Sequence, residues 1–190
     1  MVSTPLIQTF DLEGVFSWNR VRREDDRGVF VETFRRSEFD AVQAGLDLVQ
    51  DNLSLSRSIG TVRGLHFQLE PHAQAKLVSV PQGAVLDVAV DIRPGSPTFG
   101  RHVAVELSAE NATQLFVPPG FAHGFCTLRS DTIVAYKVSA YYDGPSDRGL
   151  AWDDPALGIG WPVTPEAAQL SPKDRTHPRL AELAAILGRG

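Results

Sequence analysis

The residues that could do chemistry in this sequence gather around the stretch 63–76, which sets a histidine and a lysine among short apolar residues. His66 follows a glycine and a leucine and precedes Phe67, so its ring is expected beside apolar neighbours where water is limited. A neutral imidazole is an effective proton acceptor near pH 7, above all when a carboxylate fixes its tautomer and stabilises the imidazolium. Asp174 is the candidate for that carboxylate. The two residues suggest a general base and the group that orients it.

Three further residues extend this set toward an enzyme that handles carbanions. Tyr136 lies in the apolar run 133–137, and a buried phenol opposite the base can protonate the face of a carbanion that the base cannot reach. Arg63 and Lys76 flank His66 in sequence, and a cation beside a ketone oxygen stabilises the negative charge that develops when the adjacent C–H bond is ionised. Base, acid and cation together indicate proton transfer next to a carbonyl group.

Each of these residues also has an ordinary structural interpretation. A lone histidine beside apolar residues is often a hydrogen-bonded core residue, and a tyrosine inside an apolar strand is a common core residue as well. Asp174 could cap a helix or carry a solvated charge, and Arg63 and Lys76 could be surface cations. Sequence alone does not bring His66 and Asp174 together, so the enzyme hypothesis depends on the whole set.

A second histidine, His123, lies in a Pro-x-Gly-x-x-His pattern that resembles the second motif of the cupin superfamily. In metal-binding cupins the first motif supplies His-x-His and a downstream Glu, which bind a divalent metal together with that histidine. The matching place in this sequence reads His66-Phe67-Gln68, which lacks the second histidine. The sequence therefore predicts no metal site.

Composition and charge limit the class of protein. The chain has 190 residues, which suits one domain whose core needs no disulfide or structural metal. Its 18 Lys and Arg against 23 Asp and Glu give a net charge of −5, without the basic clusters of a nucleic-acid or membrane surface. The single cysteine, Cys126, excludes an intramolecular disulfide and favours a reducing compartment. With neither a signal-peptide pattern nor an apolar run of membrane-spanning length, we expect a cytoplasmic protein.

The order of apolar and turn residues predicts a mainly β fold, a sandwich or barrel with a few short peripheral helices. Strand-like runs occur at 5–18, 29–34, 49–53, 77–80, 85–91, 102–106, 114–117 and 132–142. Turns and loops are expected at 25–28, 54–60 and 143–149. One short helix is expected at about 37–44, and a second at 178–187, ending at Gly188 and packing across the sheet.

The motifs, taken in order, closely resemble the dTDP-4-dehydrorhamnose 3,5-epimerase family, whose members are non-metal enzymes of the cupin type. The resemblance runs from about Asp11 to about Asp174, and the order of the motifs makes it far more specific than any one of them. The matching segments are Asp26-Arg27-Gly28-x-Phe30-x-Glu32, Val49-Gln50-Asp51-Asn52, Arg63-Gly64-Leu65-His66-Phe67-Gln68, Lys76-Leu77-Val78, Asp87-Val88-Ala89-Val90-Asp91-Ile92-Arg93, Pro119-Gly120-Phe121-Ala122-His123-Gly124-Phe125, Tyr136-Lys137 and Tyr141-Tyr142.

This resemblance implies a cupin-type jelly roll in a homodimer. Within the single domain 1–190, an N-terminal strand arm at 1–18 would contribute to the partner's sheet, 19–142 would form the jelly-roll core, and 143–190 would be a C-terminal loop and helix segment. The implied partners are a small-molecule dTDP-sugar and a second copy of the chain, with no nucleic acid and no membrane.

The family's reaction is the conversion of dTDP-4-dehydro-6-deoxy-D-glucose to dTDP-4-dehydro-L-rhamnose, without a cofactor, in the supply of dTDP-L-rhamnose for cell-surface polysaccharide. By motif match, His66 would be the base, oriented by Asp174, and Tyr136 the acid that protonates C5 from the opposite face. Lys76 would stabilise the enolate oxygen at C4. The chemistry agrees with the residues, because C3 and C5 both flank the C4 ketone, and one base and one acid on opposite faces can invert either centre.

Ten further residues are implied at the nucleotide-sugar site. Arg27 and Arg63 would contact the diphosphate or the sugar, and Phe30 or Tyr142 would stack on thymine. The whole set is Arg27, Phe30, Glu32, Gln50, Asn52, Arg63, His123, Tyr142, Asp147 and Lys173. Two departures concern this set: Leu53 stands where members often carry His, in a loop to Arg63 that is one residue longer than in some of them, and Asp147 stands where some carry Glu.

Three other functions remain open. A related epimerase could invert only C3 or only C5, since the outcome depends on how the sugar lies in the site. A non-catalytic sugar-nucleotide-binding cupin would keep the arginines and aromatic residues but could lose the base, and retention of His66, Lys76, Tyr136 and Asp174 weighs against it. A metal-dependent cupin oxygenase is the third alternative, which the missing ligand at Gln68 disfavours.

Overall fold

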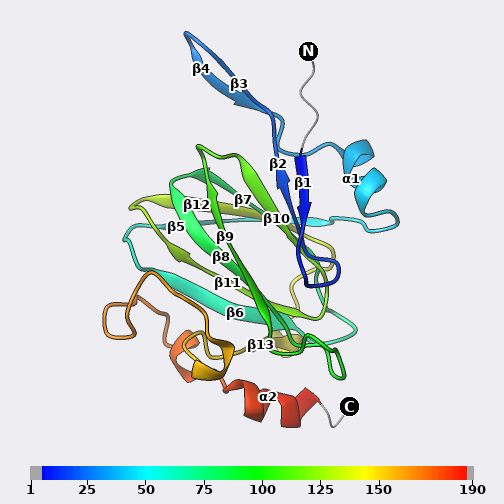
Figure 1. Ribbon diagram of the computed structural model, residues 1–190, viewed down its shortest axis with the longest axis vertical. Coiled ribbons are helices and arrows are strands. Elements are labelled where there is room, and N and C mark those ends of the chain that lie inside the picture. Colours follow the sequence, from blue (N-terminus) through cyan, green and yellow to red (C-terminus); the bar gives the residue numbers. More distant parts are fainter. Residues whose placement is uncertain (1–5, 188–190) are drawn as a thin grey trace.

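Two antiparallel sheets face each other in the computed structural model, which describes residues 6–187. The chain order and the enclosing shape are those of a jelly roll (Figure 1). The six-stranded sheet has the order β1 (Leu6–Thr9), β2 (Phe16–Asn19), β10 (Thr113–Val117), β7 (Lys76–Gln82), β12 (Thr132–Val138) and β5 (Gln50–Ser56). The five-stranded sheet has the order β13 (Asp147–Gly149), β6 (Val62–Gln68), β11 (Phe121–Thr127), β8 (Ala84–Asp91) and β9 (His102–Ser108).

The remaining elements lie outside the two sheets. A hairpin, β3 (Arg22–Asp25) and β4 (Gly28–Val31), projects from the body beyond β2 (Figure 1). The helices are α1 (Arg36–Val42) and α2 (Leu180–Leu187), and three short 3-10 turns are η1 (Gly144–Ser146), η2 (Pro155–Leu157) and η3 (Asp174–Thr176). No helix in the described part of the chain is long and apolar enough to cross a membrane.

Successive side chains of a strand point to opposite faces of its sheet, and the inward-pointing apolar side chains of both sheets fill the space between them. The six-stranded sheet contributes Val78, Val80, Leu115, Val117 and Val134 to this inner cluster, and the five-stranded sheet contributes Val85, Ala89, Leu107, Phe121 and Phe125. The inner cluster occupies only part of the interior. Polar side chains from the same inward-facing rows line the rest, and they form the site described below.

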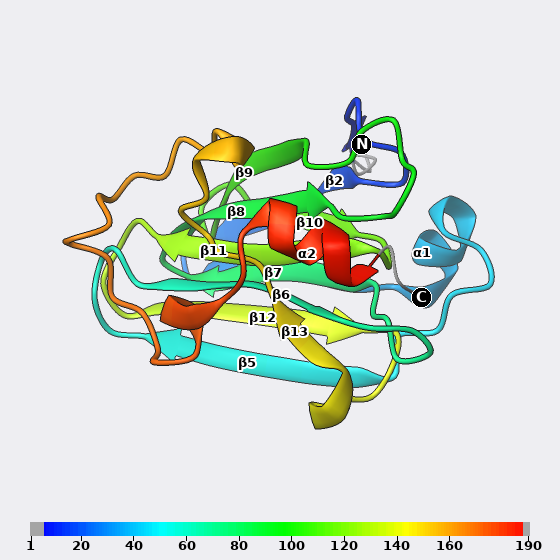
Figure 2. The same cartoon turned by 90° about the horizontal axis from the view of Figure 1, so that it is seen from below.

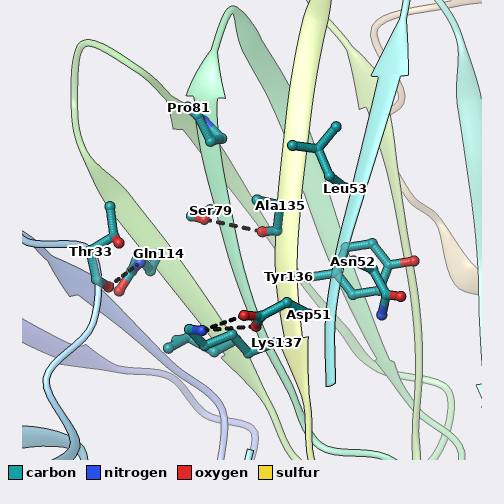
Figure 3. A pocket seen from close by; sticks show the side chains of 11 residues that line it. Thr33, Asp51, Asn52, Leu53, Ser79, Pro81, Gln114, Ala135, Tyr136 and Lys137 are labelled. Carbon is teal, nitrogen blue, oxygen red and sulfur yellow. Dashed lines mark hydrogen bonds and ion pairs between the residues drawn. The ribbon is translucent and has the colours of Figure 1, made fainter. Parts of the chain in front are cut away.

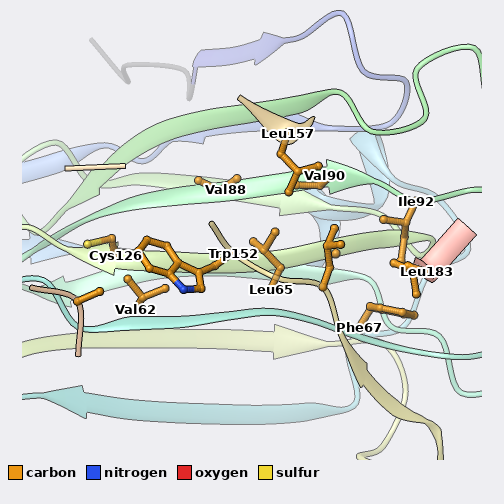
Figure 4. Packing of buried hydrophobic residues seen from close by; sticks show 13 residues of the cluster. Val62, Leu65, Phe67, Val88, Val90, Ile92, Cys126, Trp152, Leu157 and Leu183 are labelled. Carbon is orange, nitrogen blue, oxygen red and sulfur yellow. The ribbon is translucent and has the colours of Figure 1, made fainter. Parts of the chain in front are cut away.

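The C-terminal segment covers the outer face of the five-stranded sheet (Figure 2). Trp152, Leu157 and Leu183 pack onto strand residues such as Leu65 and Val88, in what we call the outer cluster (Figure 4). The indole N–H of Trp161 donates to the carbonyl of Trp152 at 2.7 Å, which ties this segment together. The covering matters for function because the same segment carries Asp174.

Cys126 lies within the outer cluster as a fully buried free thiol. Burial away from water disfavours the thiolate and raises the pKa of Cys126 to about 11.

The outer face of the six-stranded sheet is covered at one end only. Around α1, the ring of Phe39 packs edge-on against Phe116, which stacks on Phe16 with ring centroids 4.8 Å apart. At the other end, along β5, the side chains of Leu53 and Leu55 are exposed. One apolar strip of this face is therefore left open to solvent in the single chain.

The mainly β jelly roll with short peripheral helices is confirmed, and both predicted helices form. The prediction of a loop at 54–60 is wrong for its first three residues, because Ser54–Ser56 continue β5 and pair with 132–134 of β12. Gly188, the expected end of the second helix, lies outside the described residues. The sheets also take in strands on both sides of the predicted 19–142 core, because β2 pairs with β10 and β13 pairs with β6 in the same chain.

Candidate active site

Two adjoining cavities lie between the sheets and share the side chains of His66, Lys76 and Tyr136. Their volumes are about 250 and 170 Å³. Eleven of the fourteen predicted site residues line these cavities. The first cavity adds Arg63, His123, Lys173 and Asp174, and the second adds Gln50, Asn52, Tyr142 and Asp147.

The backbone of β6 is shaped to present Arg63 and His66 together. Strict alternation would put residues three apart on opposite faces, but the pairing of β6 with β11 shifts register between His123 and Phe125. At the shift, Gly64 meets Gly124 so closely that a Cβ on Gly64 would lie 2.6 Å from the Gly124 Cα. Two glycines are needed for this approach, and its result is that Arg63 and His66 line the same cavity.

His66 and Asp174 form the pair expected of a base and its orienting carboxylate. His66 Nε2 lies 2.5 Å from Asp174 Oδ1, and the side chains are 35% and 4% exposed, respectively. The backbone N–H of Asp174 donates to Ser171 Oγ, which holds the start of η3. Burial alone would raise the pKa of Asp174, yet hydrogen bonds from His177 and His66 outweigh it and hold that pKa below its usual range. The carboxylate is therefore charged at neutral pH and can stabilise an imidazolium.

Lys76, on β7, lies against His66 from the facing sheet. Its Nζ donates to the His66 carbonyl oxygen at 3.3 Å, and the side chain is buried. Burial lowers the pKa of Lys76 to about 8, although Asp87 and Asp147 pull in the other direction. A cation that is charged at neutral pH, and little solvated, can stabilise an oxyanion strongly.

Tyr136, on β12, borders the cavity from the six-stranded sheet and packs against the inner cluster. Burial raises its pKa, an effect that the charge of Arg63 opposes and that of Asp147 supports. The phenol therefore keeps its proton at neutral pH. His66 lies on the opposite sheet, so a base and an acid border one cavity from two sides.

His123, on β11, forms a second histidine–carboxylate pair. Its Nε2 lies 2.9 Å from Oδ1 of Asp87 on β8, with the side chains 7% and 0% exposed. Asp87 Oδ2 is buried without a hydrogen-bond partner in the described structure. The pair is less exposed than His66 and Asp174, and of its two residues only His123 lines the cavity.

Polar groups at the second cavity bond to one another. Gln50 donates to Asn52 at 2.9 Å and accepts from the backbone N–H of Tyr142 at 3.1 Å. The Tyr142 hydroxyl donates to Asp147 Oδ2, which also pairs with Lys173. This network fixes donors, a carboxylate and an exposed aromatic ring beside the His66 cavity.

Arg27, Phe30 and Glu32 do not reach these cavities in the single chain. Arg27, whose side chain is 89% exposed, pairs with Asp25 in the turn of the β3–β4 hairpin, and Phe30 is 63% exposed on β4. Glu32 instead forms hydrogen bonds with Arg35 at 2.6 and 2.8 Å.

Sequence reasoning missed three residues that build the site. Gln68, at the place of the second histidine of metal cupins, donates to the carbonyls of His72 and Tyr141 and accepts from the N–H of Asp143. It therefore anchors the loop that bears Tyr142. Asp87 and His177 were also missed. A charged residue in the inward-facing row of an apolar strand was a usable signal for Asp87, whereas no pattern distinguishes His177.

One group in the described residues brings together side chains of the types that bind metals. The candidate ligand atoms of His66, Asp174 and His177 lie within 4.8 Å of one another. Two hydrogen bonds to Asp174 Oδ1 already join the three side chains. This is not the cupin motif set, because His123 points to Asp87 and Gln68 to the loop.

A separate cavity of about 300 Å³ lies on the outer face of the six-stranded sheet (Figure 3). Among its described lining residues the charged groups are Lys137 and Asp51, which pair at 2.8 Å. Tyr136 and Asn52 also border this cavity, but its described lining holds no histidine to act with Tyr136, so it is not the candidate active site.

Comparison with known proteins identifies the family. A model of the family described as dTDP-4-dehydrorhamnose 3,5-epimerase matches residues 9–182. The dTDP-4-dehydrorhamnose 3,5-epimerase of Sinorhizobium fredii is 59% identical over 159 residues, covering 84% of this chain and 81% of that protein.

Solved structures extend the comparison. The dTDP-6-deoxy-D-glucose-3,5-epimerase of Legionella pneumophila, in complex with dTDP-4-keto-L-rhamnose, superposes with a TM-score of 0.91 at 42% identity, covering 97% of each chain. A 3'-monoepimerase of Streptomyces bikiniensis, in complex with dTDP-quinovose, superposes with a TM-score of 0.86 at 36% identity, covering 94% of this chain and 89% of that one.

The fold is thus a cupin-type jelly roll whose interior carries acid–base side chains. The chain belongs to the dTDP-4-dehydrorhamnose 3,5-epimerase family and is an isomerase of the epimerase type.

Proposed function

We propose that the chain epimerises dTDP-4-dehydro-6-deoxy-D-glucose at C3 and C5, giving dTDP-4-dehydro-L-rhamnose without a cofactor. One observation carries the proposal: the His66–Asp174 pair and Tyr136 border one cavity from opposite sheets, with the buried Lys76 beside His66. A relative from Sinorhizobium fredii with 59% sequence identity is named dTDP-4-dehydrorhamnose 3,5-epimerase.

The first step is removal of a proton from a carbon next to the C4 ketone. The second ring nitrogen of His66, the one not bonded to Asp174, takes the proton, and the electron pair of the C–H bond moves into an enolate whose negative charge lies on the C4 oxygen. Lys76 stabilises that charge, and Asp174 stabilises the imidazolium. The ketone acidifies both neighbouring carbons, so the same base can serve C3 and C5.

Inversion requires that the new proton arrive on the other face. Tyr136 donates its phenolic proton to C5 from the six-stranded sheet, solvent supplies the proton that C3 takes on its opposite face, and in each case the enolate collapses back to the ketone. The raised pKa of Tyr136 suits this role, because the group must hold a proton until a strongly basic carbon takes it. Solvent then restores the protonation states of His66 and Tyr136.

Binding of the nucleotide is assigned to the polar rim. Arg63 and Lys173 offer cations for the diphosphate, and Gln50, Asn52, His123 and Asp147 offer hydrogen bonds to the sugar and base. Tyr142 offers an exposed ring for stacking on thymine.

A homodimer accounts for the residues that lie away from the cavity. The β3–β4 hairpin presents Arg27 and Phe30 to solvent, far out on a projection of its own chain (Figure 1). We assign them, with Glu32, to the site of a second copy. The N-terminal region and the open apolar strip along β5 would then lie in the interface between copies.

The reaction is tested by proton NMR of the protein with dTDP-4-dehydro-6-deoxyglucose in deuterated water, following exchange at C3 and C5 separately. Deuterium at both carbons, with an L-rhamnose-configured product after reduction, is the expected result. Label at neither carbon, with dTDP still bound, would instead make the chain a binding protein. Purified protein should contain no stoichiometric iron, zinc or manganese, and finding one would favour a metal-dependent cupin.

The contribution of the partner's hairpin is tested by mixing two inactive variants. If the hairpin serves the other copy, heterodimers of His66→Asn with Arg27→Ala contain one intact site, and a random mixture regains about a quarter of wild-type sites. If Arg27 serves its own chain, every site is defective and the mixture stays inactive.

A C3-only epimerase is the second candidate, because the monoepimerase of Streptomyces bikiniensis has the same fold. Exchange confined to C3 would establish it, and exchange confined to C5 would establish the converse.

A further inference from the structure

His177 is a buried histidine to which the mechanism above gives no part. It directly follows η3, and its side chain is 7% exposed. Its Nε2 lies 3.2 Å from Asp174 Oδ1, the same oxygen that His66 Nε2 meets at 2.5 Å. Two imidazoles therefore share one carboxylate oxygen, one of them bordering the cavity and the other behind it.

The backbone around His177 holds the ring in this place. The residue is extended, with φ −65° and ψ 144°, as the following proline favours. The N–H of Ala151 donates to the Pro178 carbonyl at 2.8 Å, which ties the segment to the residues that follow β13. Gly149, on β13, lies against the imidazole so closely that a Cβ there would overlap the ring. The ring thus occupies a fitted space that requires a glycine opposite it.

His177 also contacts His66 directly, without reaching the cavity. The two rings meet edge to face, with centroids 5.5 Å apart and planes at 86°. Among the described residues that line the two cavities, His177 is absent. Any effect of His177 on substrate chemistry must therefore pass through Asp174 or His66.

We propose that His177 is a positioning residue for the His66–Asp174 pair: its Nε2–H donates to Asp174 Oδ1, fixes the carboxylate, and withdraws part of its negative charge from His66. This inference rests on the function proposed above. A carboxylate shared between two donors stabilises the imidazolium less than one that serves His66 alone. Removing the His177 donor should therefore strengthen the stabilisation that Asp174 gives to the His66 imidazolium.

The charges around the pair do not supply this effect by other means. Asp174 is the carboxylate that contacts both rings, Gly149 of β13 packs against His177, and Asp147 of the same strand lines the second cavity with His66. The other titratable or charged groups lining the first cavity are Arg63, Lys76, His123, Tyr136 and Lys173. Their charges act on His66 equally whether or not His177 is present, so the variants below isolate the hydrogen bond.

The test compares His177→Phe with His177→Gln. Phenylalanine keeps a flat ring over Gly149 but donates no hydrogen bond, whereas glutamine can place an N–H near the position of Nε2. The measurements are the NMR titration of the His66 ring without substrate, assigned with His66→Asn, and the pH profile of kcat/KM for solvent exchange. Thermal unfolding checks that each variant folds, and His177→Ala replaces His177→Phe if phenylalanine overpacks the space.

For His177→Phe we expect the His66 titration midpoint and the acid limb of kcat/KM to move together to higher pH, by about one unit. At a pH on the acid limb this costs about tenfold in kcat/KM, while dTDP affinity changes less than about twofold. His177→Gln should stay close to wild type. Equal midpoints in wild type, Phe and Gln proteins would overturn the proposal and leave His177 a packing residue. The substrate-free titration decides this even if wild-type protein exchanges neither carbon, which would refute the proposed reaction instead.

Discussion

Two histidine–carboxylate pairs lie side by side in this protein, on strand positions that are register partners, and they differ in what surrounds them. His66 and His123 are paired across β6 and β11. The His66 side chain is 35% exposed and borders the cavity broadly, whereas His123 and Asp87 are almost completely buried. The same pair of side chains can therefore be a base or a fixed hydrogen-bonding group, and access to substrate decides which.

The carboxylates also come from different parts of the fold. Asp87 belongs to β8, a neighbouring strand of the same sheet, while Asp174 arrives on η3 from the segment that covers the sheet. Asp87 is set by strand pairing alone. Asp174 depends on the packing of the outer cluster and on Ser171 and His177, so its position is set by residues that belong to no strand.

The largest expected effect separates the two histidines. His66→Asn should lower kcat by roughly 10³-fold with dTDP affinity within a few-fold, because the base is needed for proton transfer and little for nucleotide binding. The matched variant His123→Asn should act mainly on KM, by about tenfold, through a lost hydrogen bond. Steady-state kinetics and dTDP titration measure both. Equal losses of kcat in the two variants would remove the distinction between the pairs.

Loss of the Asp174 carboxylate should also lower kcat, but by less than loss of His66. Asp174→Asn keeps the shape of the side chain but removes the charge that stabilises the imidazolium, and we expect a loss of about 100-fold in kcat. Thermal unfolding of the variant controls for misfolding. A full-rate Asp174→Asn protein would show that the pair seen in the structure has no part in catalysis.

Tyr136→Phe sharpens the comparison by removing the acid and keeping both pairs. Completed inversion at C5 should fall by roughly 10- to 100-fold, while exchange at C3 survives better, because His66 still removes protons. Separate NMR signals for C3 and C5 in deuterated water give the two rates. Uniform loss at both carbons would contradict the assignment of Tyr136 as the C5 acid.

The smallest expected effect is on the pH dependence of kcat/KM, and it links Asp87 of the buried His123–Asp87 pair to Lys76. The pKa of Lys76 is lowered to about 8, so the cation is lost, and kcat/KM should fall, as pH rises above about 8, by about tenfold per unit. The charge of Asp87 raises that pKa, so Asp87→Asn should move the alkaline limb to lower pH. In Lys76→Arg any remaining activity should lack this limb, because guanidinium stays charged. An alkaline limb that is unchanged in Lys76→Arg belongs to another group.

Much of the fold could be predicted from the sequence, because the strands alternate apolar and polar residues and the turns contain glycine and proline. The prediction failed at β6 and β11, which contain the motifs of His66 and His123 yet were not predicted as strands. Their glycines, Gly64 and Gly124, weaken the strand pattern for the reason that makes them necessary, since two backbones meet there without side chains. The local signal and the functional requirement were in conflict at this position.

The site residues were named from motifs, but three features could not be read from them. The distance between His66 and Asp174 depends on how a covering segment packs, over a separation of 108 residues. The second bond to Asp174 comes from His177, which has no motif of its own. Arg27 and Phe30 match the family pattern yet lie outside the cavity of their own chain, because a motif does not say which copy it serves.

The buried thiol of Cys126 gives this protein an internal reporter. A thiol labels as the thiolate, and with a pKa of about 11 and no exposed surface Cys126 should stay unlabelled while the C-terminal segment covers the sheet. The rate at which Cys126 is alkylated therefore reports how often that segment opens away from the sheet. Because the same segment contains Asp174, comparing the alkylation rates with and without nucleotide would show how much a bound nucleotide stabilises the closed segment on the outer face of the sheet.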